Sequence, residues 1–362
     1  MIALVGEAWG ENEERLKRPF VGTSGLELIK MLGEAGLMDL TFTDKLLMKR
    51  YWNARDPTCL AEIWDAHPEL FLTNVFNLKP RPTNDISNLC GSKAQGIPSL
   101  RPLQPGKYVD NKYAGELERL RRDIAAFKGN LIICLGSTAT WALTGSTGIS
   151  KIRGTILKSE SGRKVLPVFH PAAILREWNL RHVTILDLKK GAREAAFPEI
   201  KRPARCIWIE PNLEQMEVFY DNFIRRATEL SVDIETASTQ ISCIGFAPSS
   251  RISLVVPFID HRRPDGSYWA TREHELAAWA FVRRCLAHPS RKIFQNGLFD
   301  ISILYTYYGI ETVNCAEDTM LLHHALLPES QKGLGFLGSV YTNEPAWKLL
   351  RSKEMETLKR DE

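Results

Sequence analysis

Short apolar runs alternate with helix-spaced apolar positions along the first half of the chain. The pattern predicts strands at 2–5, 70–76, 131–135 and 164–169, and helices at 24–36, 114–127, 172–178 and 183–195. This strand–helix rhythm is typical of a parallel sheet covered by helices on both faces. The segments 39–69 and 83–112 interrupt it and are interpreted as insertions, the second rich in Pro, Gly, Asn and Ser. We therefore expect an α/β/α sandwich over residues 1–195.

A different pattern begins after residues 196–205, which carry two prolines and are interpreted as a linker. Strands are expected at 206–209, 230–235, 241–247, 252–257 and 292–295, and helices at 213–227, 273–286, 298–308 and 318–327. The strands at 241–247 and 252–257 lie close in sequence and are expected to pair antiparallel. Residues 206–362 are therefore predicted to form a second α/β domain with a mixed sheet.

Composition agrees with two soluble domains. A chain of 362 residues exceeds a typical single core, and 44% hydrophobic with 25% charged residues is ordinary for a globular protein. The net charge of +4 is compatible with a nucleic-acid partner. The seven cysteines are scattered singly, which argues against disulfides, zinc and iron–sulfur sites. With no apolar run near ~18 residues, we expect a cytoplasmic protein with no membrane partner.

Three carboxylates in the second domain form a candidate metal site. Asp233 and Glu235 lie two apart on a predicted strand, so both side chains point to the same face. Asp300 follows another apolar strand where a helix should begin. Carboxylates meeting at a sheet edge suit hard divalent cations, so we expect a pair of Mg²⁺ or Mn²⁺ ions that activates water against a phosphodiester. Asp318 is interpreted instead as a helix N-cap.

These residues lie in motifs that resemble the proofreading 3′–5′ exonuclease of family A (DNA polymerase I-like) DNA polymerases. The motifs are Asp-Ile-Glu-Thr at 233–236, Asn-Gly-Leu-Phe-Asp at 296–300 and Asp-Thr-Met-Leu at 318–321. The runs at 332–341 and 345–348 are similar to the phage branch of that family. The resemblance implies a ribonuclease H-like, DEDD-type fold. It assigns the metals to Asp233 and Asp300, water orientation to Glu235, and a place beside the terminal nucleotide to Asn296.

One departure concerns the third motif of this family, a Tyr or His shortly before a final metal-binding Asp. No such pair follows Asp318, and Tyr341 is followed four residues later by Pro345. Either the sequence is a fragment of a longer polymerase or the exonuclease is incomplete. The final run has helical character without a stop signal, which favours the fragment.

Four short segments in the first domain follow predicted strands or lie in loops that can reach the strand ends. They are Gly-Glu-Ala-Trp-Gly at 6–10, Arg-Pro-Phe-Val-Gly at 18–22, Thr-Asn-Val at 73–75 and His-Pro-Ala-Ala-Ile-Leu-Arg at 170–176. Ligands of open α/β sheets bind in the crevice at the carboxyl ends of the strands. An acid, an aromatic ring, a carboxamide and an imidazole can together bind a flipped-out base and act on it.

The same segments resemble the uracil-DNA glycosylase superfamily, in particular its family 4 pattern. The resemblance assigns water positioning to Glu7, stacking on uracil to Phe20, reading of its edge to Asn74, stabilisation of the departing uracil anion to His170 and a phosphate contact to Arg176. The loop at 171–175 would wedge into the duplex.

Two departures from the family 4 pattern change the expected pocket. Trp9 stands where the family has a proline, so we place it among the base-binding residues, at a crowded pocket mouth. The cysteines that hold the family's cluster are missing, because nothing precedes the first strand and residues 76–79 carry none. No iron–sulfur cluster is therefore expected.

Both halves point to DNA with an accessible base or 3′ end. The sequence favours the N-terminal part of a phage-type family A DNA polymerase, a hydrolase acting in replication and repair, with the polymerase domain later in the same parent polypeptide. It would proofread 3′ ends and recognise or excise uracil. The alternative is an inactive DNA-binding region that positions template. A stand-alone RNA-processing exonuclease is a third, weaker possibility.

Overall fold

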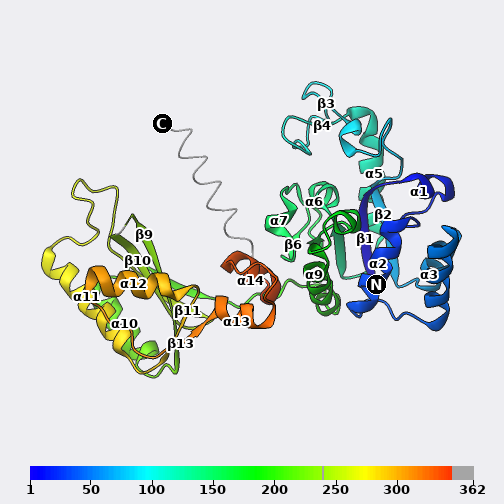
Figure 1. The fold of residues 1–362 in the computed structure, drawn as a ribbon. Coiled ribbons are helices and arrows are strands. Elements are labelled where there is room, and N and C mark those ends of the chain that lie inside the picture. The colour runs from blue at the N-terminus through cyan, green and yellow to red at the C-terminus, as the bar shows by residue number, and fades with distance from the viewer. Residues whose placement is uncertain (239, 345–362) are drawn as a thin grey trace. The chain divides into compact units, whose positions relative to one another are not determined.

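The computed structural model describes residues 1–238 and 240–344 and divides the chain into two compact units (Figure 1). Unit 1 comprises Met1–Lys201 together with the described residues from Gly335 onward, and unit 2 comprises Arg202–Leu334. Within the described residues, no helix has both the length and the apolar character that a membrane span requires.

Unit 1 is built on a five-stranded sheet. Its strands are β1 (Ile2–Ala8), β2 (Leu70–Phe76), β5 (Leu131–Leu135), β7 (Lys164–Val168) and the two-residue β6 (Leu157–Lys158), in the order β2-β1-β5-β7-β6. All neighbours are parallel except β6 and β7. The parallel α/β fold predicted for this half is thus confirmed.

Helices cover both faces of this sheet. Along β1, Leu4 packs into a cluster with residues of α2 (Thr23–Glu34), α8 (Pro171–Arg176) and α9 (Leu180–Glu194). Its neighbour Val5 packs into a second cluster with residues of α5 (Ala114–Ala126) and α6 (Ser137–Thr144). This alternation follows from the two-residue period of a strand. Short helices α1 (Glu11–Leu16) and α7 (Ile149–Ile152) complete the unit.

The two segments interpreted as insertions differ from each other. Residues 39–69 contain two helices, α3 (Phe42–Ala54) and α4 (Thr58–Ala66), which the sequence analysis missed. Helix α3 begins with a capping box between Thr41 and Asp44. Residues 83–112 are largely irregular, with 3₁₀ turns at Ile86–Leu89 and Asn111–Tyr113 and a small ladder of β3 (Cys90–Gly91) with β4 (Tyr108–Val109).

Unit 2 is built on a mixed six-stranded sheet. Its strands are β8 (Cys206–Ile209), β9 (Glu229–Ala237), β10 (Gln240–Ser249), β11 (Ile252–Pro257), β12 (Arg291–Phe294) and β13 (Cys315–Asp318), in the order β13-β12-β9-β10-β11-β8. The antiparallel pairing of β10 with β11 is confirmed, and β12 runs parallel to β9. The mixed sheet bears out the predicted ribonuclease H-like fold. The short edge strand β13 was not predicted.

In the part of unit 2 that the structure describes, four helices accompany the sheet. They are α10 (Leu213–Phe219), which continues into a π turn at Tyr220–Ile224, α11 (Arg272–Ala287), α12 (Gly297–Tyr308) and α13 (Thr319–Leu326). Aromatic rings fill much of this core. Phe258, Trp279 and Tyr308 form a stack with ring centroids 3.8 and 4.5 Å apart.

The last described helix, α14 (Leu334–Tyr341), packs within unit 1 although it follows the unit 2 elements in sequence. Arg153 donates to the Ser339 hydroxyl at 3.1 Å and to Asp187 at 2.6 Å. Lys190 donates to the carbonyls of Gly154 and Ser339. The side chains of Arg153, Asp187 and Lys190 are all buried, so unit 1 uses this helix to satisfy internal charges.

Candidate functional site

A cavity of about 590 Å³ opens at the carboxyl ends of the parallel strands of unit 1. Its lining includes Glu7, Phe20, Asn74, His170 and Arg176, five of the six residues assigned to the base site from sequence. Glu7, Asn74 and His170 meet there because β1, β2 and β7 are parallel and end at the same edge of the sheet. This edge is where ligands of open α/β sheets were expected to bind.

Glu7 lies near the end of β1, with its carboxylate facing the cavity. Thr138, in the first turn of α6, donates to Glu7 Oε2 at 2.5 Å. Burial raises the pKa of the Glu7 carboxyl, the Thr138 hydrogen bond opposes that shift, and nearby Asp85 adds to it. The hydrogen bond therefore fixes the orientation of the carboxylate, and the raised pKa makes it a stronger base than an ordinary glutamate.

Asn74 and Phe20 meet over the backbone of Gly6. A Cβ atom at Gly6 would lie 2.2 Å from Asn74 Oδ1 and 2.6 Å from Phe20 Cζ. Asn74 is only 2% exposed, so its carboxamide is fixed in the cavity wall. Glycine at position 6 is thus required by the close approach of these two side chains.

The backbone of Phe20 is in the left-handed region, with φ of 57°. Trp64 Nε1 donates to the Phe20 carbonyl at 2.9 Å. Gly25 leaves room for the same carbonyl, since a Cβ at residue 25 would come within 1.8 Å of it. A bulky residue in this conformation carries backbone strain, and such strain tends to cluster at binding sites.

His170 is the N-cap of α8, and its Nδ1 accepts a hydrogen bond from the Ala172 backbone N–H at 3.1 Å. Because Nδ1 is an acceptor, the single proton of the neutral ring lies on Nε2. Burial, with a smaller contribution from the charge of Arg176, lowers the pKa of His170 to about 4. At neutral pH the ring is therefore a neutral imidazole with its N–H donor at Nε2.

Trp9 does not line the cavity, contrary to its expected place at the pocket mouth. The indole is 9% exposed, and the amino group of Lys17 lies 5.3 Å from its ring centroid. The Trp9 backbone N–H donates to the Leu78 carbonyl at 3.1 Å, and the large apolar ring is buried there. Its Nε1 has no hydrogen-bond partner in the described part of the chain.

Two cavity residues were missed from sequence. Glu13 is buried and its carboxylate accepts from the Gly22 backbone N–H at 2.8 Å, which ties α1 to the loop that carries Phe20. Thr138, the partner of Glu7, comes three residues after the last residue of strand β5, Leu135. Its position at a strand end was a usable signal, whereas nothing local distinguishes Glu13 from the other acids of α1.

The predicted carboxylate cluster of unit 2 lies around β9. Val232 and Ile234 are buried while Asp233 and Glu235 are exposed, so the two acids share one face of the strand. Asp300, in the first turn of α12, is 5% exposed and its Oδ1 accepts from the Ile234 backbone N–H at 3.0 Å. That bond places the Asp300 carboxylate against the backbone of β9 at Ile234, the residue between Asp233 and Glu235 in sequence.

The acids of this cluster affect one another. Burial, followed by the charge of Asp233, raises the pKa of Asp300 to about 6, although the Ile234 hydrogen bond opposes the shift. Burial and the charge of Glu235 raise the pKa of Asp233. Carboxylate oxygens are the ligands that hard divalent cations prefer, and a positive charge would relieve the repulsion between these acids. Among the described residues, however, no three Asp, Glu, His or Cys side chains are grouped closely enough to hold a metal ion, so the expected three-ligand, two-metal cage is not assembled.

Asp318 is the N-cap of α13, as predicted. Its carboxylate accepts from the backbone N–H groups of Met320 and Leu321, and also from those of Asn296 and Gly297 at 3.1 and 2.8 Å. These four bonds outweigh burial and lower the pKa of Asp318. Asn296 itself has a left-handed backbone with φ of 60°, at the start of α12. Pro345, which stands where a third motif beginning at Tyr341 would need its Asp, lies outside the described residues.

Comparison with known proteins identifies both halves. The model of the uracil DNA glycosylase superfamily matches residues 1–196, more than half of the chain. The chain belongs to the uracil DNA glycosylase superfamily. A 3′–5′ exonuclease family model matches residues 213–355, so a superfamily domain is fused here to an exonuclease domain. The corresponding resemblances predicted from sequence are confirmed at this level, whereas the polymerase and phage assignments remain predictions.

Individual relatives are more distant. The type-4 uracil-DNA glycosylase of Thermotoga maritima is 25% identical over 198 residues, covering 52% of this chain and 75% of that protein. Escherichia coli RNase D aligns with a TM-score of 0.28 and 14% identity over 38% of this chain, which spans only 33% of RNase D. The EXD2 exonuclease domain soaked in Mg and dGMP aligns with a TM-score of 0.26 and 18% identity, over 40% of this chain and 72% of that one.

Proposed function

We propose that unit 1 of this superfamily member removes uracil from DNA. The observation that supports this function is the convergence of Glu7, Phe20, Asn74, His170 and Arg176 on one cavity. The relatives over this half are named as type-4 uracil-DNA glycosylases. A base must leave the helical stack to reach such a site, and a cavity of about 590 Å³ has room for it.

Each cavity side chain has a role in this proposal. The Phe20 ring stacks on the base, and the Asn74 carboxamide accepts from uracil N3–H and donates to O4. As the bond between N1 and the sugar C1′ breaks, negative charge develops on uracil O2, and the His170 Nε2–H donates to it. A neutral donor suits this step, because the pKa of His170 is lowered to about 4.

The carboxylate of Glu7 completes the hydrolysis. It stabilises the positive charge on the sugar and takes a proton from the water that attacks C1′. The products are free uracil, protonated from solvent, and an abasic sugar with a new hydroxyl at C1′. Arg176, at the end of α8, would contact a phosphate of the flipped nucleotide.

For unit 2 we infer metal-dependent hydrolysis of the 3′-terminal phosphodiester of DNA. Asp233 and Asp300 would hold a divalent cation such as Mg²⁺ or Mn²⁺, and Glu235 would orient the attacking water. When bound, the cation would supply activation of that water and stabilisation of the leaving oxygen. The raised pKa values of Asp233 and Asp300 support this role. Burial is the main cause of both shifts and a neighbouring carboxylate adds to each, so a bound cation would relieve the crowded negative charge. Asn296 would lie beside the terminal nucleotide.

We also propose that the two units act within a family A DNA polymerase, with proofreading and uracil recognition on one polypeptide. The motif order in unit 2 supports this placement. The test is a 5′-labelled oligonucleotide, with and without one uracil, incubated with the full chain and Mn²⁺. Shortening from the 3′ end that stops in Asp233→Ala supports the nuclease. Labelled DNA that stays intact in all samples, even after alkali treatment that cleaves at abasic sites, would instead favour an inactive DNA-binding region.

A further inference from the structure

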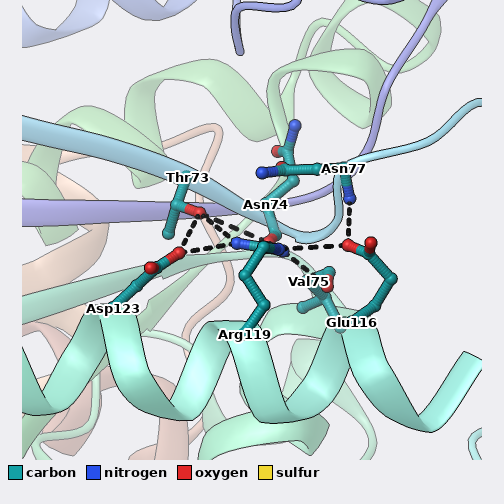
Figure 2. Close-up of polar contacts among 7 residues, drawn as sticks. All are labelled: Thr73, Asn74, Val75, Asn77, Glu116, Arg119 and Asp123. Atoms are coloured by element: carbon teal, nitrogen blue, oxygen red, sulfur yellow. Dashed lines mark hydrogen bonds and ion pairs between the residues drawn. The ribbon is translucent and has the colours of Figure 1, made fainter.

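One arginine holds the carboxyl end of the strand that carries Asn74. Arg119 projects from α5 toward β2, and its Nη2 donates to the carbonyls of Asn74 at 2.7 Å and Val75 at 3.0 Å (Figure 2). Its Nη1 donates to the Thr73 hydroxyl at 3.0 Å. Three consecutive residues of the strand end therefore share a single guanidinium.

The guanidinium is itself oriented by its own helix. Glu116, one turn earlier, accepts from Arg119 Nε at 3.1 Å, and Asp123, one turn later, accepts from Nη1 at 2.6 Å. Glu116 also accepts from the Asn77 backbone N–H at 2.8 Å (Figure 2). The planar fork of arginine can make these bonds simultaneously, which an ammonium group cannot.

The sheet topology explains why this strand end needs such a partner. β2 is an edge strand that pairs only with β1 in the described sheet, up to Phe76 opposite Ala8. The groups on its outer edge receive no hydrogen bonds from a neighbouring strand. Arg119 lies on α5, which packs against β2, and its guanidinium supplies donors to carbonyls at this strand end.

We propose that Arg119 is a positioning residue that sets the Asn74 carboxamide against the edge of the bound base. The proposal rests on the uracil excision proposed above. Asn74 Oδ1 is already in close approach to Gly6, so the carboxamide has little room to correct a shift of its backbone. A displacement of about 1 Å in such a site can cost on the order of 100-fold in rate.

A purely structural role for Arg119 makes a different prediction, and Arg181 provides the matched control. Arg181 lies in the same unit, on α9, and pairs with Glu27 at 2.7 Å and Glu34. The two arginine side chains are similarly exposed, 20% for Arg119 and 16% for Arg181. Arg181 donates to no carbonyl of the pocket strands, so its loss should reduce stability alone.

The experiment measures release of uracil and of cytosine from matched single-stranded oligonucleotides by the full chain, with EDTA present to silence the nuclease. Arg119→Ala is expected to lower kcat/KM for uracil by about 10- to 100-fold, mainly through kcat, and to narrow the preference for uracil over cytosine. Arg119→Lys should recover part of both losses. Arg181→Ala should leave kcat/KM for uracil and the preference for uracil over cytosine unchanged, at a temperature where all variants are folded.

Three results would overturn the proposal or its basis. If Arg119→Ala behaves like Arg181→Ala, the positioning role is wrong while uracil excision stands. If the wild-type chain releases no uracil, excision is wrong and the positioning role falls with it. Should Arg119→Ala fail to fold, Arg119→Lys replaces it, and an unchanged kcat and base preference in that variant would contradict the proposal.

Discussion

The Nδ1 atom of His170 accepts a hydrogen bond from the backbone N–H of Ala172 at 3.1 Å. This bond fixes the tautomer of the ring and, together with burial, favours its neutral form. The pKa of His170 is lowered to about 4, from an ordinary value near 6.5. The site therefore combines a neutral imidazole donor with the carboxyl group of Glu7, whose pKa is raised by burial.

The pH dependence of uracil excision follows from these two groups. His170 is neutral above pH ~4, so no inflection attributable to it is expected between pH 5 and 8. The rate should fall on the acid side as Glu7 protonates, at a pH above that of an ordinary glutamate because the pKa of Glu7 is raised. A pH–kcat/KM profile checks this. An inflection near 6.5 that disappears in His170→Gln would show that the imidazolium acts instead.

The neutral state of His170 also affects stability, with a definite sign. Its folded-state pKa of about 4 lies below the unfolded value, so the unfolded chain binds the proton first as the pH falls. The free energy of unfolding should therefore decrease as the pH drops from ~6.5 toward 4. In His170→Gln this decrease should be smaller, as measured by urea unfolding at several pH values. An identical pH dependence in the variant would contradict the burial of a neutral ring.

Gly6→Ala should disable the base pocket. The new Cβ would lie 2.2 Å from Asn74 Oδ1 and 2.6 Å from the Phe20 ring, so one of them must move. We expect a loss of about 1–3 kcal/mol in stability and of most uracil release. Gly115→Ala is the matched control, because a Cβ there meets no atom within 4 Å, and it should leave both unchanged or slightly increase stability. Full activity in Gly6→Ala would refute the pocket geometry.

Metal binding by unit 2 should weaken as the pH falls through about 6. The raised pKa of Asp300 means that a proton competes with the cation for this carboxylate in that range. Calorimetric titration with Mn²⁺ at pH 7.5 and 5.0 checks this, with at least about tenfold weaker binding expected at the lower pH. Asp300→Asn should abolish the difference, whereas Asp221→Asn, at an exposed surface pair, should preserve it. Equal affinity at both pH values would exclude Asp300 as a ligand.

Lys190, the buried lysine that contacts α14 and the residue after it, should contribute to the stability of unit 1. Lys190 donates to the carbonyls of Gly154, Ser339 and Thr342, so Lys190→Met leaves buried acceptors without partners. We expect the free energy of unfolding to drop by about 2–4 kcal/mol in urea titration. Lys189→Met, at the exposed neighbouring position, should change it by less than about 0.5 kcal/mol. Similar losses in both variants would show that α14 adds no such contact.

Much of the first site follows from one topological rule. Glu7, Asn74 and His170 each follow or end a short apolar run, and parallel strands bring such positions to one edge. Trp9 follows the same run as Glu7, yet its bulk turns it into the interior. Arg119 gave no local signal, because its bonds to the strand end depend on how α5 packs against β2.

Other features needed the tertiary structure or were overlooked. The helix α3 was missed although Thr41 and Asp44 form a capping box that is readable from sequence. The strand β13 is four residues long and carries two acids, so no periodicity marks it. The two-residue spacing of Asp233 and Glu235 predicts their shared face, but the bond from Ile234 to Asp300 joins residues 66 apart.

The most direct test of the account is the release of free uracil from a defined uracil-containing oligonucleotide in EDTA, quantified by chromatography. We predict release by the wild-type chain and by Asp233→Asn, and loss of at least about 100-fold in Glu7→Gln and His170→Asn. No release by the wild-type chain, or release that survives both pocket substitutions, would contradict the proposal that this cavity excises uracil.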